Sequence, residues 1–127
     1  MIIWTDGFPN YKEVSDMKFF KLQALRITSG WTVKYNNFSE YDPETDGPED
    51  SLELCEDLLQ LENNNLLVDL GWYGDYDNGQ YIMYMVDTTM ENPFYKPVEK
   101  LETRSKKEIL YYLEYWTDYN HYYNYIK

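Results

Sequence analysis

The segment from Asp42 to Glu53 has the residue spacing of a calcium-binding loop. Oxygen-bearing side chains stand at positions 1, 3, 5, 9 and 12 of a twelve-residue EF-hand pattern, and Gly47 stands at position 6. Position 3 is Glu44, where Asp or Asn is usual, and the residues before the loop alternate like a strand instead of an entering helix. A solvated acidic loop that contacts a partner is therefore the favoured interpretation. A calcium-binding module over 42–53 is the alternative.

A second group of oxygen ligands stands directly before Gly79. Asp75, Asp77 and Asn78 lie close together in the sequence, but Asp and Asn before a glycine are also what a tight turn requires. The turn is the favoured interpretation. Tyrosines flank this segment, and tyrosine beside carboxylates suits the recognition of Lys and Arg through ion pairs and cation–π contacts.

The sequence contains no recognisable catalytic constellation. His121 is the only histidine, and no pattern around it supplies a nucleophile for it to activate. Cys55, the only cysteine, is predicted to pack on the apolar face of a short helix. Phosphate-binding loops, dinucleotide fingerprints and Cys/His zinc spacings are absent from the sequence. We therefore expect a protein without enzymatic activity, metal or cofactor.

The acidic residues are concentrated in one part of the chain. Residues 35–95 contain fifteen Asp and Glu and neither Lys nor Arg, whereas the remaining residues carry a net +3 of the total −12. A field of one sign speeds encounter with a partner of the opposite sign. A basic protein is therefore the expected partner. Nucleic acid and anionic membranes are not, because their phosphates would be repelled.

Length and composition set the broad class. A chain of 127 residues fits one domain, 1–127, and 43% hydrophobic with 19% aromatic residues excludes a disordered acidic tail. The start, Met1 to Asp6, lacks a basic leader, and no stretch of the sequence reaches the ~20 apolar residues of a membrane span. We therefore expect a cytoplasmic location.

Hydrophobic periodicity predicts an antiparallel α+β domain, with about four to five strands and two helices packed on one face of the sheet. Asn78-Gly79 is expected to supply the positive φ angles of a tight turn between two strands. Trp31, Trp72 and Trp116 are expected core residues. The predicted elements are strands over 18–27 and 31–36, a helix over 51–61, a hairpin of 66–73 and 80–86, an edge strand over 98–103, and a helix starting at the capping box Ser105–Glu108.

Four stretches of the sequence resemble small bacterial immunity proteins of polymorphic-toxin and contact-dependent inhibition systems. They are Gly30–Val33, Leu66–Tyr73, Glu91–Pro93 and Glu102–Glu108, and the likeness spans residues 17–117. It implies a cytoplasmic single-domain protein that binds a toxin domain and occludes its active site. Toxins of this kind are often cationic nucleases. A phage-type DNA mimic that inhibits a host defence enzyme is the alternative from another class.

Charge and position alone, not the resemblance, indicate the residues that bind the partner. Two acidic segments, the 40–50 loop and the 74–79 tip, supply the carboxylates that steer association. Neighbouring tyrosines supply anchors. The predicted partner-binding residues are Asp42, Glu44, Asp46, Glu49, Asp50, Tyr73, Asp75, Tyr76 and Asp77.

Overall fold

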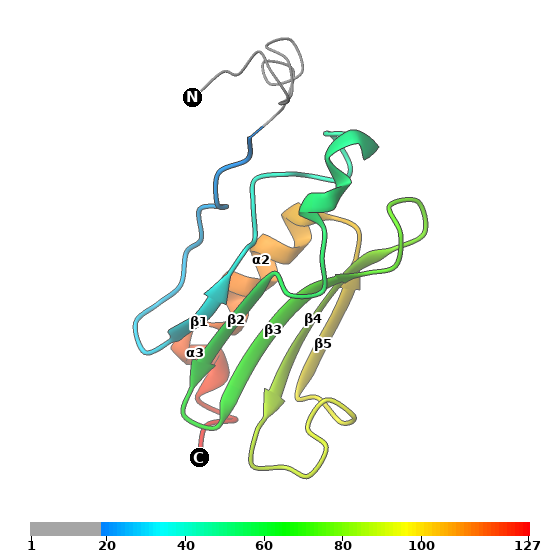
Figure 1. The fold of residues 1–127 in the computed structure, drawn as a ribbon. Helices are drawn as coiled ribbons and strands as arrows, with labels where there is room; N and C mark the ends of the chain where they lie inside the picture. The colour runs from blue at the N-terminus through cyan, green and yellow to red at the C-terminus, as the bar shows by residue number, and fades with distance from the viewer. Residues whose placement is uncertain (1–18) are drawn as a thin grey trace, which may run out of the picture.

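The computed structural model describes residues 19–127, which form a five-stranded antiparallel sheet with helices on one face (Figure 1). Strand order in the sheet equals strand order in the chain. The predicted α+β class is confirmed. Residues 1–18, including Met1–Asp6, lie outside the described residues. The elements are β1 (Thr32–Asn36), η1 (Pro48–Glu53), β2 (Leu59–Asn63), β3 (Leu66–Tyr73), β4 (Gln80–Asp87), β5 (Glu99–Thr103), α2 (Lys106–Trp116) and α3 (Tyr119–Tyr122).

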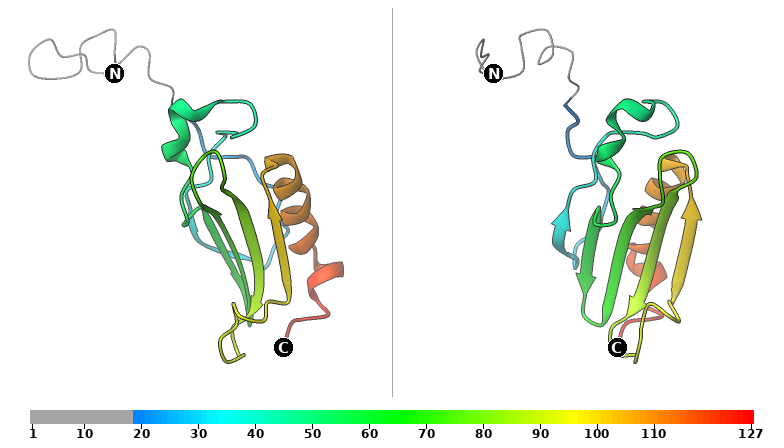
Figure 2. Two further views of the ribbon diagram at one scale, coloured as in Figure 1. Left: turned by 90° about the vertical axis from the view of Figure 1, so that its right-hand side faces the viewer. Right: turned by 45° about the vertical axis from the view of Figure 1, so that its right-hand side comes forward.

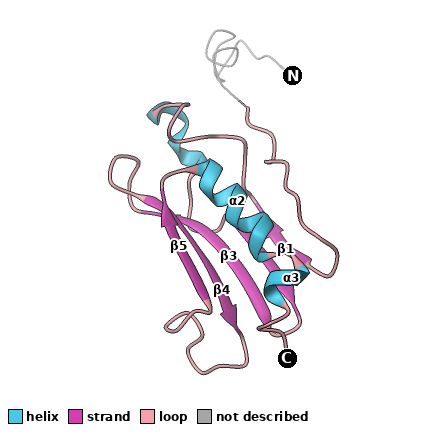
Figure 3. Cartoon of the chain, turned by 180° about the vertical axis from the view of Figure 1, so that it is seen from behind, coloured by secondary structure: helices cyan, strands magenta, loops and turns pink. Residues whose placement is uncertain are grey.

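The core lies between the sheet and α2. Alternate residues of the three central strands face the helix and are completely buried, because a strand turns successive side chains to opposite faces. The helix contributes Ile109, Leu113 and Trp116 at helical spacing. Figure 3 shows α2 and α3 lying across this face. The strand residues of the core are Leu59, Leu61, Leu66, Val68, Leu70, Trp72, Tyr81, Met83 and Met85.

The predicted start of the C-terminal helix at Ser105 is confirmed, but only the N-cap half of the capping box forms, because the Ser105 N–H donates to the Thr103 hydroxyl and not to Glu108. The Ser105 hydroxyl accepts a hydrogen bond from the backbone N–H of Glu108 at 3.1 Å, and α2 begins at the next residue, Lys106. Trp72 and Trp116 are buried and Trp31 packs half-buried against the core, as expected. The Trp31 indole also donates to the Thr117 carbonyl at 3.1 Å, which ties the chain before β1 to the end of α2.

The other face of the sheet carries no helix in the described part of the chain, as the edge-on view in Figure 2 shows. We call it the open face. Its middle row crosses four strands through the paired residues Gln60, Asp69, Tyr84 and Lys100. Among residues 19–127 the structure contains no helix long and apolar enough to span a membrane.

The helix predicted over 51–61 is wrong. The chain forms the short 3₁₀ helix η1, runs extended through Leu54, and enters β2 at Leu59. Leu59 and Leu61 are both buried with Gln60 between them, which is a strand alternation that also fits a helical period. Cys55 is exposed and not a core residue, because the extended segment turns it to solvent.

The strand predicted over 18–27 is also wrong over residues 19–27, the part that the structure describes. Residues 19–28 contain one isolated bridge, between Leu22 and Ser39. The strand predicted over 31–36 is β1, and it pairs with β2 and not with residues 19–28. The physical reason is burial: Phe19 and Leu22 are 74% and 58% exposed, so the apolar residues of this stretch do not share one buried face. Lys18 lies outside the described residues.

The hairpin of β3 and β4 and the edge strand β5 are confirmed, but the turn chemistry differs from the prediction. Gly74, not Asn78 or Gly79, has the positive φ, of 99°. The tip is a six-residue loop over 74–79 in which the Asp75 carboxylate accepts from the Asn78 backbone N–H at 2.7 Å. This bond shapes the turn without the left-handed angles expected at Asn78-Gly79.

Candidate functional site

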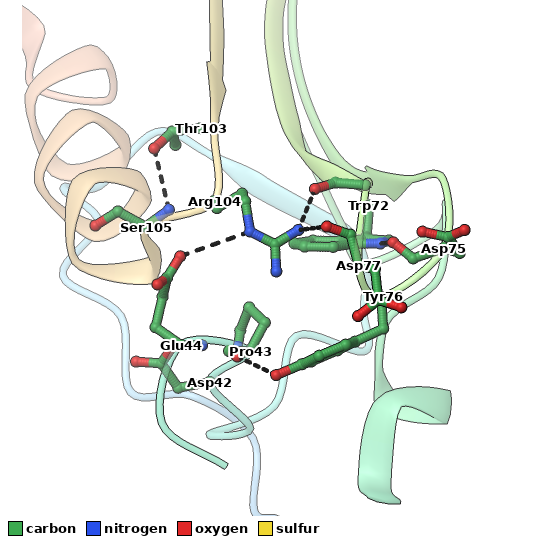
Figure 4. Close-up of polar contacts among 11 residues, drawn as sticks. Asp42, Pro43, Glu44, Trp72, Asp75, Tyr76, Asp77, Thr103, Arg104 and Ser105 are labelled. Carbon is green, nitrogen blue, oxygen red and sulfur yellow. Dashed lines mark hydrogen bonds and ion pairs between the residues drawn. The ribbon is translucent and has the colours of Figure 1, made fainter. Parts of the chain in front are cut away.

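The two acidic segments predicted to bind a partner lie side by side at one end of the sheet. The Tyr76 hydroxyl, on the tip, donates a hydrogen bond to the Pro43 carbonyl of the 40–50 loop at 2.9 Å (Figure 4). The 74–79 tip joins β3 to β4, and the 40–50 loop follows β1. The bond from Tyr76 to Pro43 therefore joins two residues that are 33 positions apart in the sequence. We call residues 40–50 and 74–79 together the acidic end.

Arg104 holds this end together. Its guanidinium lies 5.2 Å from the Trp72 ring and 5.8 Å from the Tyr76 ring. It donates to the Gly79 carbonyl at 2.6 Å and approaches Glu44 at 3.8 Å (Figure 4). A planar guanidinium can stack on aromatic rings and donate hydrogen bonds at the same time. One cation therefore braces both acidic segments.

The junction between β5 and α2 places Arg104. The residue stands between the last residue of the strand, Thr103, and the helix cap, Ser105. The Thr103 hydroxyl accepts from the Ser105 N–H at 3.0 Å, which fixes the chain direction at this point. On the tip side, the Trp72 indole donates to the carbonyls of Gly74 and Asp75 at 3.0 and 3.3 Å. The arginine and the tip are thus both anchored on rigid elements.

A buried lysine supports the base of the 40–50 loop. Lys106 is 5% exposed, and its ammonium donates to the Ser39 carbonyl and, at 2.9 Å, to the Gln23 amide oxygen. Burial lowers the pKa of Lys106 to about 8, against the opposing effect of nearby carboxylates led by Asp42. The first residue of α2 therefore fixes the chain that enters the acidic loop.

Inside the 40–50 loop, carboxylates bond to the loop's own backbone. Asp46 accepts from the Asp42 N–H at 2.8 Å, and Asp42 accepts from the Glu44 N–H at 2.9 Å. The buried Tyr41 donates its hydroxyl to the Gly47 carbonyl at 2.5 Å. In an EF-hand, side-chain oxygens of this kind point at the bound calcium ion. Here they accept hydrogen bonds from the backbone of the loop and determine its shape. In residues 19–127 no group of three or more His, Cys, Asp or Glu is placed to hold a metal.

The predicted site residues fall into two groups. The exposed ones are Glu44, Glu49, Asp75 and Asp77; the half-buried ones are Asp42, Asp46, Asp50 and Tyr76. All eight belong to the acidic end. The Tyr76 hydroxyl bonds to the Pro43 carbonyl and its ring lies 5.8 Å from the Arg104 guanidinium, so Tyr76 positions the two loops relative to each other.

Tyr73 does not belong with the other predicted residues. It stands next to Trp72 on β3, and strand alternation turns it to the open face. There it lies near Asp69, whose carboxylate accepts a hydrogen bond from the Gln60 amide at 2.8 Å. Burial raises the pKa of Asp69, and the neighbouring Asp57 raises it further, while the Gln60 hydrogen bond acts in the opposite direction.

We expect Asp69→Asn to increase the free energy of unfolding at neutral pH. The pKa of Asp69 is raised in the folded protein, so its ionised form is less favourable there than in the unfolded chain, and the gain should shrink as pH falls and Asp69 takes up a proton. Urea denaturation at neutral pH and at about pH 4 measures this. Glu91→Gln, at an exposed position, is the control. An equal gain at both pH values would contradict the assignment.

Sequence reasoning missed Arg104 and Lys106 as parts of the site. The pattern Ser105-x-x-Glu108 dominates that stretch and indicates only a helix start. The available signal was charge: Arg104 is a base directly before a cap, in a chain whose acidic segments lack any base of their own. Comparison of the chain with protein-family models, curated protein sequences and solved structures gives no match.

Proposed function

We propose that the chain is a cytoplasmic immunity protein that binds a basic toxin domain through its acidic end and occludes the toxin's active site. The observation that carries the proposal is the meeting of two acidic segments at one end of the sheet, braced by Arg104 and Tyr76. Eight carboxylates lie in residues 40–50 and 74–79, with Arg104 as the cation between them. Such a surface is complementary to Lys and Arg side chains.

The bracing contacts favour this use because they reduce the entropy lost on binding. A loop that is already tied by hydrogen bonds and stacked rings needs less ordering when a partner docks. The exposed carboxylates of Glu44, Glu49, Asp75 and Asp77 stand on these tied loops. An interface of about 1,600 Å² would be typical, with affinity decided by a few central contacts and the outer acids steering association.

The resemblance to immunity proteins implies that the toxin is encoded beside this chain, so the test is binding to the toxin domain expected there. We expect the association rate to fall about tenfold or more between about 0.05 M and about 0.5 M salt, because ions screen exposed charges beyond a few ångströms. Surface plasmon resonance separates association from dissociation, and dissociation should change less.

Two outcomes would contradict the proposal. A tight complex whose association rate is flat across this salt range would place recognition away from the acidic end. Failure to bind the neighbouring toxin, with no protection of cells that express it, would remove the immunity function. Tight binding instead to a DNA-binding host defence enzyme would favour the DNA-mimic alternative.

A further inference from the structure

A separate hollow lies where α2 meets α3. The N-cap of α2, Ser105, follows Arg104, which braces the acidic end, and α2 runs from there toward α3 (Figure 3). The hollow is lined by residues of the second half of α2 and of α3, away from that cap. The hollow has a volume of about 600 Å³, within the range of about 300 to 1,000 Å³ common for small-molecule sites. Its lining includes Tyr111, Tyr115, Glu114, Asp118 and His121.

Aromatic rings form one wall of the hollow. Tyr111 and Tyr115 are one helical turn apart on α2, and their side chains are 65% and 50% exposed. The Tyr115 ring lies against the His121 imidazole, with centroids 4.4 Å apart and planes 37° apart. His121 is held on its other sides by Glu99, which contacts its Nε2, and by the Tyr125 ring. The wall is therefore pre-shaped, and both tyrosines remain partly exposed to solvent.

Two carboxylates also line the hollow. Glu114 and Asp118 are spaced i, i+4 across the end of α2, and Asp118 uses one oxygen to cap α3 through the Asn120 N–H at 2.9 Å. Within residues 19–127 neither carboxylate forms an ion pair, and no Lys or Arg lines the hollow. Both also border a smaller hollow of about 290 Å³ that Arg26 lines.

The lining selects one chemical class of ligand. An anion would meet two carboxylates of its own sign, and an apolar ligand would take their water away without replacing it. A bound metal ion needs more oxygen ligands than these two carboxylates supply, and no group of three or more ionisable ligands is placed for one in the described residues. An organic cation suits both the carboxylates and the tyrosines of the lining, because it forms ion pairs with carboxylates and is attracted to aromatic rings.

We propose that the α2–α3 hollow binds an organic cation, an ammonium or guanidinium group on an aliphatic chain. The charged group lies between Glu114 and Asp118, and the chain lies against the rings of Tyr111 and Tyr115. The ligand is either a free polyamine or a Lys or Arg side chain of another protein. The site is independent of the acidic end and of the toxin proposed to bind there.

The single histidine of the chain provides a direct readout. The full-length protein is titrated at constant pH and ionic strength with spermidine in one arm and with N-acetyl-arginine amide in the other. Proton NMR follows the ring signals of His121. We expect a saturable shift with at least one probe and none with sodium chloride. Saturation with spermidine alone indicates a polyamine site, and saturation with the arginine amide alone or with both indicates a side-chain site.

Matched variants locate the binding. Glu114→Gln is expected to weaken the responding probe about tenfold, and Tyr115→Leu similarly, whereas Glu108→Gln at the other, exposed end of α2 should leave it unchanged. Circular dichroism checks that each variant is folded. The absence of a saturable shift with both probes, or equal affinities for Glu114→Gln and Glu108→Gln, would overturn the proposal. Asp77→Lys, which tests the acidic end, should not alter this titration.

Discussion

Replacing Gly71 with alanine is expected to lower the free energy of unfolding by about 3 kcal/mol. A Cβ at this position would stand 2.1 Å from the Glu56 carbonyl oxygen, 2.9 Å from the Glu56 carbonyl carbon and 3.0 Å from the Tyr73 ring. The nearest atom belongs to the main chain, so no side-chain rotation can relieve the overlap. The segment that leads into β2 would have to move away from β3.

That movement would break specific bonds. The Trp72 N–H donates to the Cys55 carbonyl at 2.8 Å, and the Leu58 N–H donates to the Leu70 carbonyl at 3.1 Å. Both attach the extended segment to β3 on either side of Gly71. Leaving such backbone groups without partners in a partly buried place costs stability beyond the steric overlap itself.

Urea denaturation followed by tryptophan fluorescence measures the effect of Gly71→Ala. Leu67→Ala is the control, because it changes a half-buried residue on the open face of the same strand, and it should cost only about 1 kcal/mol. The double variant Gly71→Ala with Tyr73→Ala should not recover the lost stability, since the main-chain overlap stays. A loss for Gly71→Ala within about 0.5 kcal/mol of zero would show that the segment yields easily.

The combination Asp77→Lys with Tyr76→Ala is expected to weaken binding of the toxin domain about 100-fold. Tyr76→Ala removes the ring that lies against Arg104 and the hydroxyl bonded to Pro43, so the tip is no longer tied to the 40–50 loop. Asp77→Lys reverses an exposed charge on the same tip. The loss therefore combines a disordered surface with a repulsive contact.

A matched control exists at the opposite end of the sheet. Glu91→Lys with Tyr95→Ala makes the same chemical changes on the loop after β4, where Glu91 is exposed and Tyr95 is 86% exposed. This pair should weaken binding less than about threefold, the scale of a peripheral ion pair. Tyr76→Phe should fall between, since it keeps the ring and loses the bond to Pro43. Equal losses at the two ends would show that the acidic end is not the interface.

The sequence predicted those parts of the fold whose local signals agreed with the tertiary structure. β3 and β4 alternate cleanly, and Ser105 with Glu108 marks the start of α2 without ambiguity. The 51–61 stretch failed because leucines there satisfy a helical and a strand period at once. The decision between them came from pairing with β3, which local sequence does not contain.

The candidate site shows the same division. Charge placed the interface on two acidic segments, and the structure brings these segments together through Pro43 and Tyr76. Strand parity separates Tyr73 from them, which depends on the observed register. Charge was a sequence signal for Arg104, but its contacts with Gly79 and Trp72 depend on the distance between β5 and the tip, which the sequence does not contain.

The strand order has a consequence for how the chain folds. Each strand pairs with the strand directly before it, so most pairings join strands that are neighbours in the sequence, and local pairing of this kind favours fast folding. The helix that covers the sheet, α2, follows all five strands in the chain. During synthesis the apolar side of β3 and β4 is therefore complete before α2 leaves the ribosome, and α2 ends the period in which that surface can aggregate.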